Sequence, residues 1–76
     1  MGYYVIECQN DGKTGSAIPL WYEDESAAES KYHQILSAAA VSKLPLHGAI
    51  LMEDTFHTFE RQVYDRTQNN TEETEE

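Results

Sequence analysis

The stretch from Ser26 to Ser42, SAAESKYHQILSAAAVS, decides the fold because it carries a long helical pattern. Its apolar residues recur at the three- and four-residue spacing of an amphipathic helix. They are Ala28, Tyr32, Ile35, Leu36 and Ala39. Ser26 and Glu29 have the S-x-x-E form of a capping box, in which each side chain bonds the backbone amide of the other residue. We therefore predict one helix here, ended before Pro45 because proline cannot continue the helical hydrogen bonds.

Four short segments around this helix have the composition of β-strands. They are rich in aromatic, β-branched and other apolar residues and are bounded by turn residues such as Asn10-Asp11-Gly12. Their ranges are Tyr3 to Gln9, Ser16 to Tyr22, His47 to Met52 and His57 to Tyr64. Pro19 has no amide donor, which confines the second strand to an edge or marks a bulge. The order ββαββ predicts an α+β fold: a four-stranded, mainly antiparallel sheet with one helix on one face.

A single helix can cover one face of such a sheet. The first and third strands nevertheless carry apolar residues on both faces, the pattern of strands that are covered on both sides. At 76 residues the chain is also short for a self-sufficient core. We therefore expect a homo-oligomer that covers the second face, with Tyr4 and Ile6 in the interface. The side of the helix opposite the apolar stripe is either a second contact with a partner or an ordinary solvent-facing surface.

The formal charge of −9 is unevenly divided. Residues 67–76, TQNNTEETEE, hold four glutamates and no base, which predicts a disordered acidic tail after a single domain over residues 1–66. The five Lys and Arg residues are scattered, whereas a protein that binds DNA or RNA directly needs a clustered basic patch. The acidic excess either serves solubility or imitates a nucleic acid toward a basic protein.

Catalytic and metal-binding patterns are not evident in the sequence. Cys8 is the single cysteine and falls within a predicted strand, which favours an inert thiol and a reducing compartment. The three histidines have no zinc-binding spacing, and no nucleophile motif or glycine-rich phosphate loop occurs. No apolar run reaches the ~18 residues of a membrane span. We expect a cytoplasmic protein that is not an enzyme and has no cofactor, metal or membrane partner.

The remaining candidates for function are residues that bind without reacting. Aromatic faces can stack on planar ligands, and bases can donate to anionic groups. The candidate ligand-binding residues are Trp21, Tyr22, Lys31, His33, His47 and Arg61. Taken one at a time, each is better explained as an ordinary surface residue near a core, and Tyr32 belongs to the core stripe. Only their convergence in one pocket would indicate a site.

Residues 28–52, AESKYHQILSAAAVSKLPLHGAILM, resemble a group of short uncharacterised bacteriophage and prophage proteins of gut bacteria. The shared core is AESKYH-x-x-L-x-AAAVS-x-x-P-x-H-x-A, after an N-terminal strand like YYVIECQ. Members of the group often end in Tyr-Lys-His, where this chain has Tyr64-Asp65-Arg66, so a basic role there would fall to Arg66.

The phage setting implied by this resemblance favours a binding protein that counters host defence inside an infected or lysogenic bacterium. One mechanism is sequestration of a nucleotide-derived immune signal in pockets between the subunits of a homo-oligomer. The alternative is an acidic inhibitor that occupies a host nucleic-acid-binding or defence protein. A phage accessory protein with neither role is the third possibility.

Overall fold

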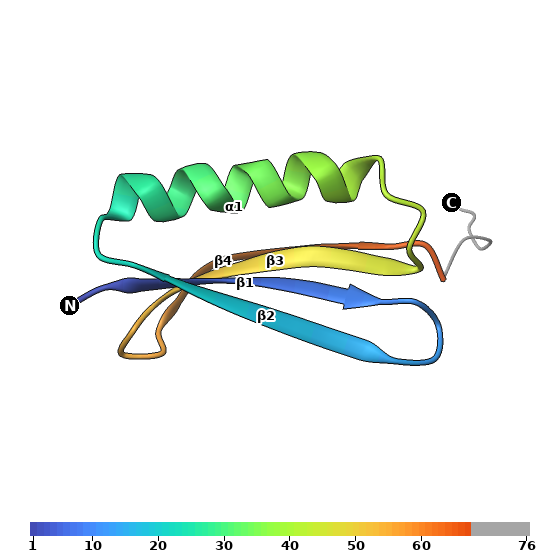
Figure 1. The fold of residues 1–76 in the computed structure, drawn as a ribbon, viewed down its shortest axis with the longest axis horizontal. Helices are drawn as coiled ribbons and strands as arrows, with labels where there is room; N and C mark the ends of the chain where they lie inside the picture. The colour runs from blue at the N-terminus through green and yellow to red at the C-terminus, as the bar shows by residue number, and fades with distance from the viewer. Residues whose placement is uncertain (68–76) are drawn as a thin grey trace.

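The computed structural model describes residues 1–67, and over these it forms one sheet of four strands with one helix (Figure 1). The elements are β1 (Tyr3–Asn10), β2 (Gly15–Tyr22), α1 (Glu25–Ala40), β3 (Leu46–Glu53) and β4 (Thr58–Asp65). The spatial order of the strands is β2-β1-β3-β4, and every neighbouring pair is antiparallel. The predicted α+β fold with a ββαββ order is therefore confirmed. β2 is an outer strand, as Pro19 indicated.

The hydrophobic core lies between α1 and the two central strands. Its buried side chains are Val5, Ala28, Tyr32, Ile35, Ala49 and Leu51. Val5 pairs with Leu51 across the β1–β3 ladder, so these two side chains lie next to each other beneath the helix. The predicted apolar stripe is the face that α1 buries, although Leu36 at its margin is only partly buried.

The beginning of α1 differs from the prediction. The N-cap residue is Asp24, whose carboxylate accepts a hydrogen bond from the Ala27 amide at 3.1 Å. Ser26 therefore lies inside the first turn, and the predicted Ser26–Glu29 capping box is wrong. Aspartate and serine are similarly good N-caps, and only the extended backbone at Asp24 decides between them.

Arg66 holds the end of α1 against the end of β4. Its Nη2 donates to the carbonyl oxygens of Ala39 at 2.8 Å and Ala40 at 3.1 Å, and its Nη1 donates to the Leu44 carbonyl at 3.3 Å. The guanidinium also lies 5.7 Å from the ring centroid of Tyr64. A cation thus satisfies carbonyl groups that every helix leaves free at its C-terminus. The predicted tail begins one residue later, and residues 68–76 lie outside the described part of the chain.

Candidate binding surface

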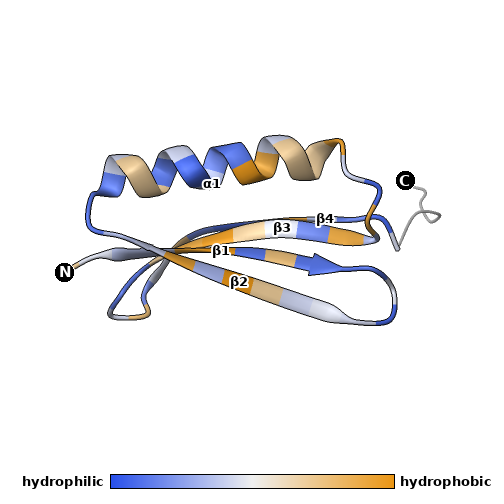
Figure 2. Ribbon diagram, viewed as in Figure 1, coloured by the Kyte–Doolittle hydropathy of each residue, from blue (hydrophilic) through white to orange (hydrophobic). Residues whose placement is uncertain are grey.

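The face of the sheet opposite α1, here called the open sheet face, is covered by no other element of residues 1–67 (Figure 1). Since Val5 faces the helix, its neighbours along β1 face the other way, and the ladder register assigns their cross-strand partners to the same side. The apolar members are Tyr4, Ile6, Cys8, Ala17, Pro19, Trp21, Leu46, Ile50, Met52 and Val63. Figure 2 shows hydrophobic segments, in orange, along β1, β2 and β3. This placement agrees with the orientation predicted for Tyr4 and Ile6.

Trp21 is seated on this face by Gly2. A Cβ at position 2 would lie 2.2 Å from the indole ring, so only glycine leaves room for the ring there. Gly2 is itself fixed by Asp54, since its amide donates to the Asp54 carboxylate at 2.7 Å and its carbonyl accepts from the Asp54 amide at 2.9 Å. Trp21 nevertheless remains 51% exposed, so a held indole ring presents much of its surface to solvent.

A second aromatic side chain is displayed at the same end of the sheet. Phe56, in the turn between β3 and β4, has a φ of 73°, a left-handed conformation that bulky residues rarely adopt. Its ring stacks on Tyr4 at 6.5 Å between centroids and stays 74% exposed. Strained residues of this kind cluster at functional positions. Both features favour a role of this aromatic end in binding.

Charge is sparse on the open sheet face. Within the four described strands, the charged residues of this face are Arg61 and Asp65, both on the outer strand β4. More carboxylates gather around the ring of Tyr3 on the helix side, at the same end of the sheet as Trp21. The pKa of Tyr3 is raised by burial and further by four nearby carboxylates, those of Glu25, Glu53, Asp24 and Asp54. The open sheet face is thus nearly uncharged in a strongly acidic protein.

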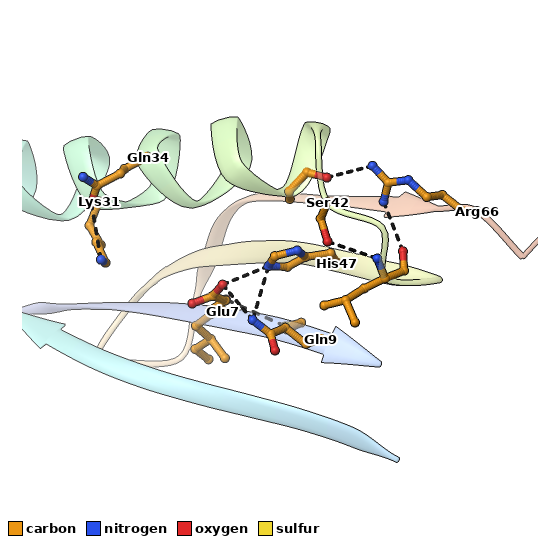
Figure 3. A network of polar contacts seen from close by, with 11 residues as sticks. Glu7, Gln9, Lys31, Gln34, Ser42, His47 and Arg66 are labelled. Atoms are coloured by element: carbon orange, nitrogen blue, oxygen red, sulfur yellow. Dashed lines mark hydrogen bonds and ion pairs between the residues drawn. The ribbon is translucent and has the colours of Figure 1, made fainter. Parts of the chain in front are cut away.

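The helix side of the sheet contains a polar network centred on His47 (Figure 3). Nε2 of His47 lies 2.8 Å from the Glu7 carboxylate, and the Gln9 side-chain amide donates to the same carboxylate at 3.0 Å. The His47 hydrogen bond is the main reason that the pKa of Glu7 is lowered, with weaker contributions from Gln9 and the Lys31 charge. His47 is only 6% exposed, and its Nδ1 has no hydrogen-bond partner among residues 1–67. The network therefore binds β1 to β3 beneath the helix.

The six predicted ligand-binding residues do not share one pocket in the protomer. Trp21 and Arg61 both lie on the open sheet face, but on the two outer strands at opposite edges. Lys31 and His47 both act on Glu7 from the helix side, where the Lys31 ammonium also donates to Gln34 at 3.3 Å. The remaining two residues, Tyr22 and His33, also lie apart from each other. Tyr22 packs against the core, and His33 is exposed on α1 with its ring edge-on to Tyr32.

Sequence reasoning missed a shallow depression at the other end of the sheet. It has a volume of about 230 Å³. Its lining residues are Gln9, Asn10, Asp11, Thr14, Ser16 and Leu44. Asp11 closes this turn by accepting from the amides of Lys13 and Thr14, both at 2.9 Å, which lowers the pKa of its carboxyl. The turn residues were visible in the sequence, but their approach to Leu44 is a tertiary contact that no local pattern carries.

Three further observations concern the Cys8 thiol, metal binding and membrane-spanning helices. Burial raises the pKa of the Cys8 thiol, and the nearby Glu7 charge raises it further, which disfavours the nucleophilic thiolate. Residues 1–67 hold no group of three or more His, Cys, Asp or Glu residues placed to bind a metal ion. No helix in this part of the chain has the length and apolar character needed to cross a membrane.

Comparisons with protein-family models, with curated proteins and with solved structures find no match to this chain.

Proposed function

We propose that this chain is a small, non-enzymatic binding protein that works as a homo-oligomer and sequesters a nucleotide-derived signal. The observation that carries the proposal is the open sheet face, an apolar and nearly uncharged surface that presents a partly exposed Trp21. In the setting implied by the phage resemblance, the protein would act in the cytoplasm of a bacterial host and counter its defence.

The electrostatics favour this face over the helix side for an anionic ligand. Phosphate groups would be repelled by the carboxylates that surround Tyr3, and one of these, Asp54, holds Gly2 beneath Trp21. A phosphate group must therefore point from Trp21 along the open sheet face, whose strands carry a single carboxylate, Asp65. Stacking of one base on an aromatic side chain contributes about 1–3 kcal/mol. Because Trp21 rests on Gly2, its ring loses little further freedom when a ligand stacks on it.

The proposal requires a second subunit. Arg61 lies at the opposite edge of the sheet from Trp21, so these two residues of one chain cannot hold the same small ligand. Of the predicted ligand-binding bases, none lies beside Trp21 in the same chain, and we therefore propose that a neighbouring subunit supplies the base for a ligand stacked on Trp21. This places the proposed pocket at a subunit boundary, at the rim of the open sheet face.

The test is a thermal-shift and calorimetric screen against linear and cyclic nucleotides, with the ligand recovered intact after the protein is denatured. Binding stabilises the fold by RT ln(1 + [L]/Kd), about 2.7 kcal/mol at a hundredfold excess of ligand over Kd. For a domain of this size, that corresponds to a melting-temperature rise of roughly 10–20 °C. We expect Trp21→Ala to abolish the rise and Trp21→Phe to retain part of it. Absence of a rise across the panel, or conversion of the ligand to a product, contradicts the proposal.

An acidic inhibitor of a host protein is the second candidate, favoured by the carboxylates that converge near Tyr3. Asp24 and Glu25 at the start of α1 lie close to Glu53 and Asp54 at the end of β3, so one end of the molecule is strongly negative. A surface of this kind suits a basic protein. This function predicts a salt-sensitive complex with a basic host protein that Glu25→Gln combined with Glu53→Gln weakens and Trp21→Ala leaves intact.

A further inference from the structure

We infer that a second copy of this chain covers the open sheet face, related by a two-fold axis that lies between the sheets and perpendicular to the strands. This inference rests on the homo-oligomer in the proposed function and specifies its geometry. In this arrangement each strand lies over the same strand of the other copy and runs in the opposite direction. The aromatic end of one face, at Trp21 and Tyr4, then meets the hairpin end of the other.

The size of the face requires nearly complete overlap. The four strands have eight residues each. Such a sheet is about 26 Å long and about 19 Å wide, or roughly 500 Å² per copy. Two copies would bury about 1,000 Å², which is the lower limit for a specific interface. A shifted contact would fall below this limit, so the axis must pass near the centre of the face.

The distribution of side-chain volume selects the direction of the axis. The face is bulky at one end, where Trp21, Tyr4 and Met52 lie side by side, and has less side-chain volume at the other. There the corresponding row is Gly15, Asn10 and Leu46. Sheets pack about 10 Å apart, with the side chains of the two faces interdigitating. An axis parallel to the strands would place the bulky ends of the two copies against each other and leave a gap between their small ends. The perpendicular axis instead places Trp21 over Gly15 of the second copy.

Gly48 has no room for a side chain. A Cβ at this position would lie 2.2 Å from the Gln62 carbonyl oxygen and 2.6 Å from the Val63 Cα, so the close approach of β4 excludes any larger residue. The Val63 side chain closes over this position, since its Cγ2 would lie 2.9 Å from that Cβ, and Gly48 is buried within the protomer. Ile50 of the second copy would therefore pack on Val63 beside Gly48.

The charges of the face fit the same axis. Arg61 would lie over Val63 of the second copy, two residues along the strand from both Asp65 and Arg61 of that copy. The two Arg61–Asp65 attractions then outnumber the single Arg61–Arg61 repulsion at the same spacing. With the axis parallel to the strands, β4 would lie over β2. The residues of β2 on this face are Gly15, Ala17, Pro19 and Trp21, none of which is charged. Only the perpendicular axis pairs the opposite charges.

The arrangement also supplies the base that the proposed ligand site lacks. The Trp21 ring extends over Gly2, beyond the end of its own ladder, and would therefore reach past Gly15 of the second copy to its hairpin turn. Lys13 lies in that turn and is exposed. The composite site thus consists of Trp21 from one copy and Lys13 from the other, which suits a planar base bearing a phosphate group.

The first test is reversal of the two charges, measured by analytical ultracentrifugation at low and high salt. We expect Arg61→Asp and Asp65→Arg each to raise the dimer Kd about tenfold or more, equivalent to 1.4 kcal/mol. The double variant should return to within about threefold of the wild-type Kd. The two residues are roughly 13 Å apart along one strand, so recovery cannot come from a contact within the chain. A monomeric wild-type protein refutes both the inference and the proposed homo-oligomer, whereas a dimer without recovery refutes the axis alone.

The second test distinguishes this face-to-face dimer from pairing of two β4 edges, which could also bring Arg61 near Asp65. Trp21 is the single tryptophan of the chain, so its emission reports one position. The labelled chain carries Trp21→Phe and Cys8→Ser, so that it has neither a tryptophan nor a second thiol. A nitroxide is attached at Lys13→Cys or at Thr55→Cys, and the labelled chains are mixed with wild-type chains, which supply the Trp21 emission. Quenching by the label at position 13 alone is expected. Quenching from position 55 indicates the parallel axis, and none from either indicates edge pairing, so both overturn the inference.

Discussion

Replacement of Arg66 by alanine should cost this small domain a large part of its stability. The guanidinium donates to three backbone carbonyls, those of Ala39, Ala40 and Leu44, at 2.8, 3.1 and 3.3 Å. A hydrogen bond from a charged donor contributes about 1.5–3 kcal/mol when well formed. Because the side chain is partly exposed and one of its bonds is long, we expect a total of about 2–3 kcal/mol for Arg66→Ala. Whole domains of this size unfold at about 3–10 kcal/mol.

The assay is urea and thermal denaturation followed by circular dichroism, at one fixed protein concentration because self-association adds to apparent stability. A loss of 2–3 kcal/mol corresponds to a melting-temperature fall of roughly 10–20 °C. Arg66→Lys keeps the charge near the helix C-terminus but loses the fork of donors, so it should recover at most about 1 kcal/mol. Lys43→Ala removes an exposed cation near the same helix end and should change stability by less than about 0.5 kcal/mol.

A change within about 0.5 kcal/mol of wild type for Arg66→Ala, on the order of an ordinary surface substitution, would contradict the role assigned to the guanidinium. That role is also contradicted if Lys43→Ala costs as much as Arg66→Ala, because a diffuse charge effect would then explain the loss. If Arg66→Ala causes the expected loss of stability, the result also bears on the phage resemblance. The basic residue near the end of β4 would then serve to hold the helix against the sheet rather than to contact a ligand.

Three further predictions concern the network, the helix start and the strained turn. The pKa of Glu7 is lowered from 4.5, so its contribution to stability is present above that pH and lost as the pH falls through the lowered pKa. Acid titration of the unfolding free energy should show this loss, and Glu7→Gln should remove it. Asp24→Ala should cost about 1 kcal/mol and Ser26→Ala less than about 0.5, by thermal denaturation. Phe56→Gly relieves a left-handed strain of roughly 1 kcal/mol, which offsets the lost stacking, so stability should hold within 0.5 kcal/mol while the dimer Kd rises.

The elements of the fold were predictable because their signals are local. The stripe through Ala28, Tyr32 and Ile35 repeats at helical spacing, and each strand ends at turn residues. The edge position of β2 followed from one residue, Pro19, because a missing amide donor has the same consequence in any sheet. The prediction of the N-cap residue was wrong because its signal is not local. Asp24 and Ser26 are both good caps, and the choice depends on where the chain leaves β2, which is a tertiary constraint.

The candidate site was less predictable because binding surfaces depend on which strands become neighbours. Periodicity places Trp21 and Arg61 on strand faces but does not order the strands, and the order β2-β1-β3-β4 sets these two residues at opposite edges. His47 shows the opposite effect. In the sequence it is a free base, but the register pairs its position with Gln9 and brings its ring to Glu7, and the network then uses its donor internally.

The strand order also favours assembly through the open sheet face. With β1 and β3 in the centre, the most apolar strands lie side by side, and their second faces form one continuous strip instead of two separate edges. Polar or charged residues at Tyr4, Ile6 or Ile50 would serve a solvent-facing sheet at least as well. The stacking of Phe56 on Tyr4, beside that strip, only offsets the cost of the left-handed backbone at Phe56, so the protomer gains little net stability from this residue. A single cause, binding through the open sheet face, would explain both the apolar strip and the exposed, strained Phe56.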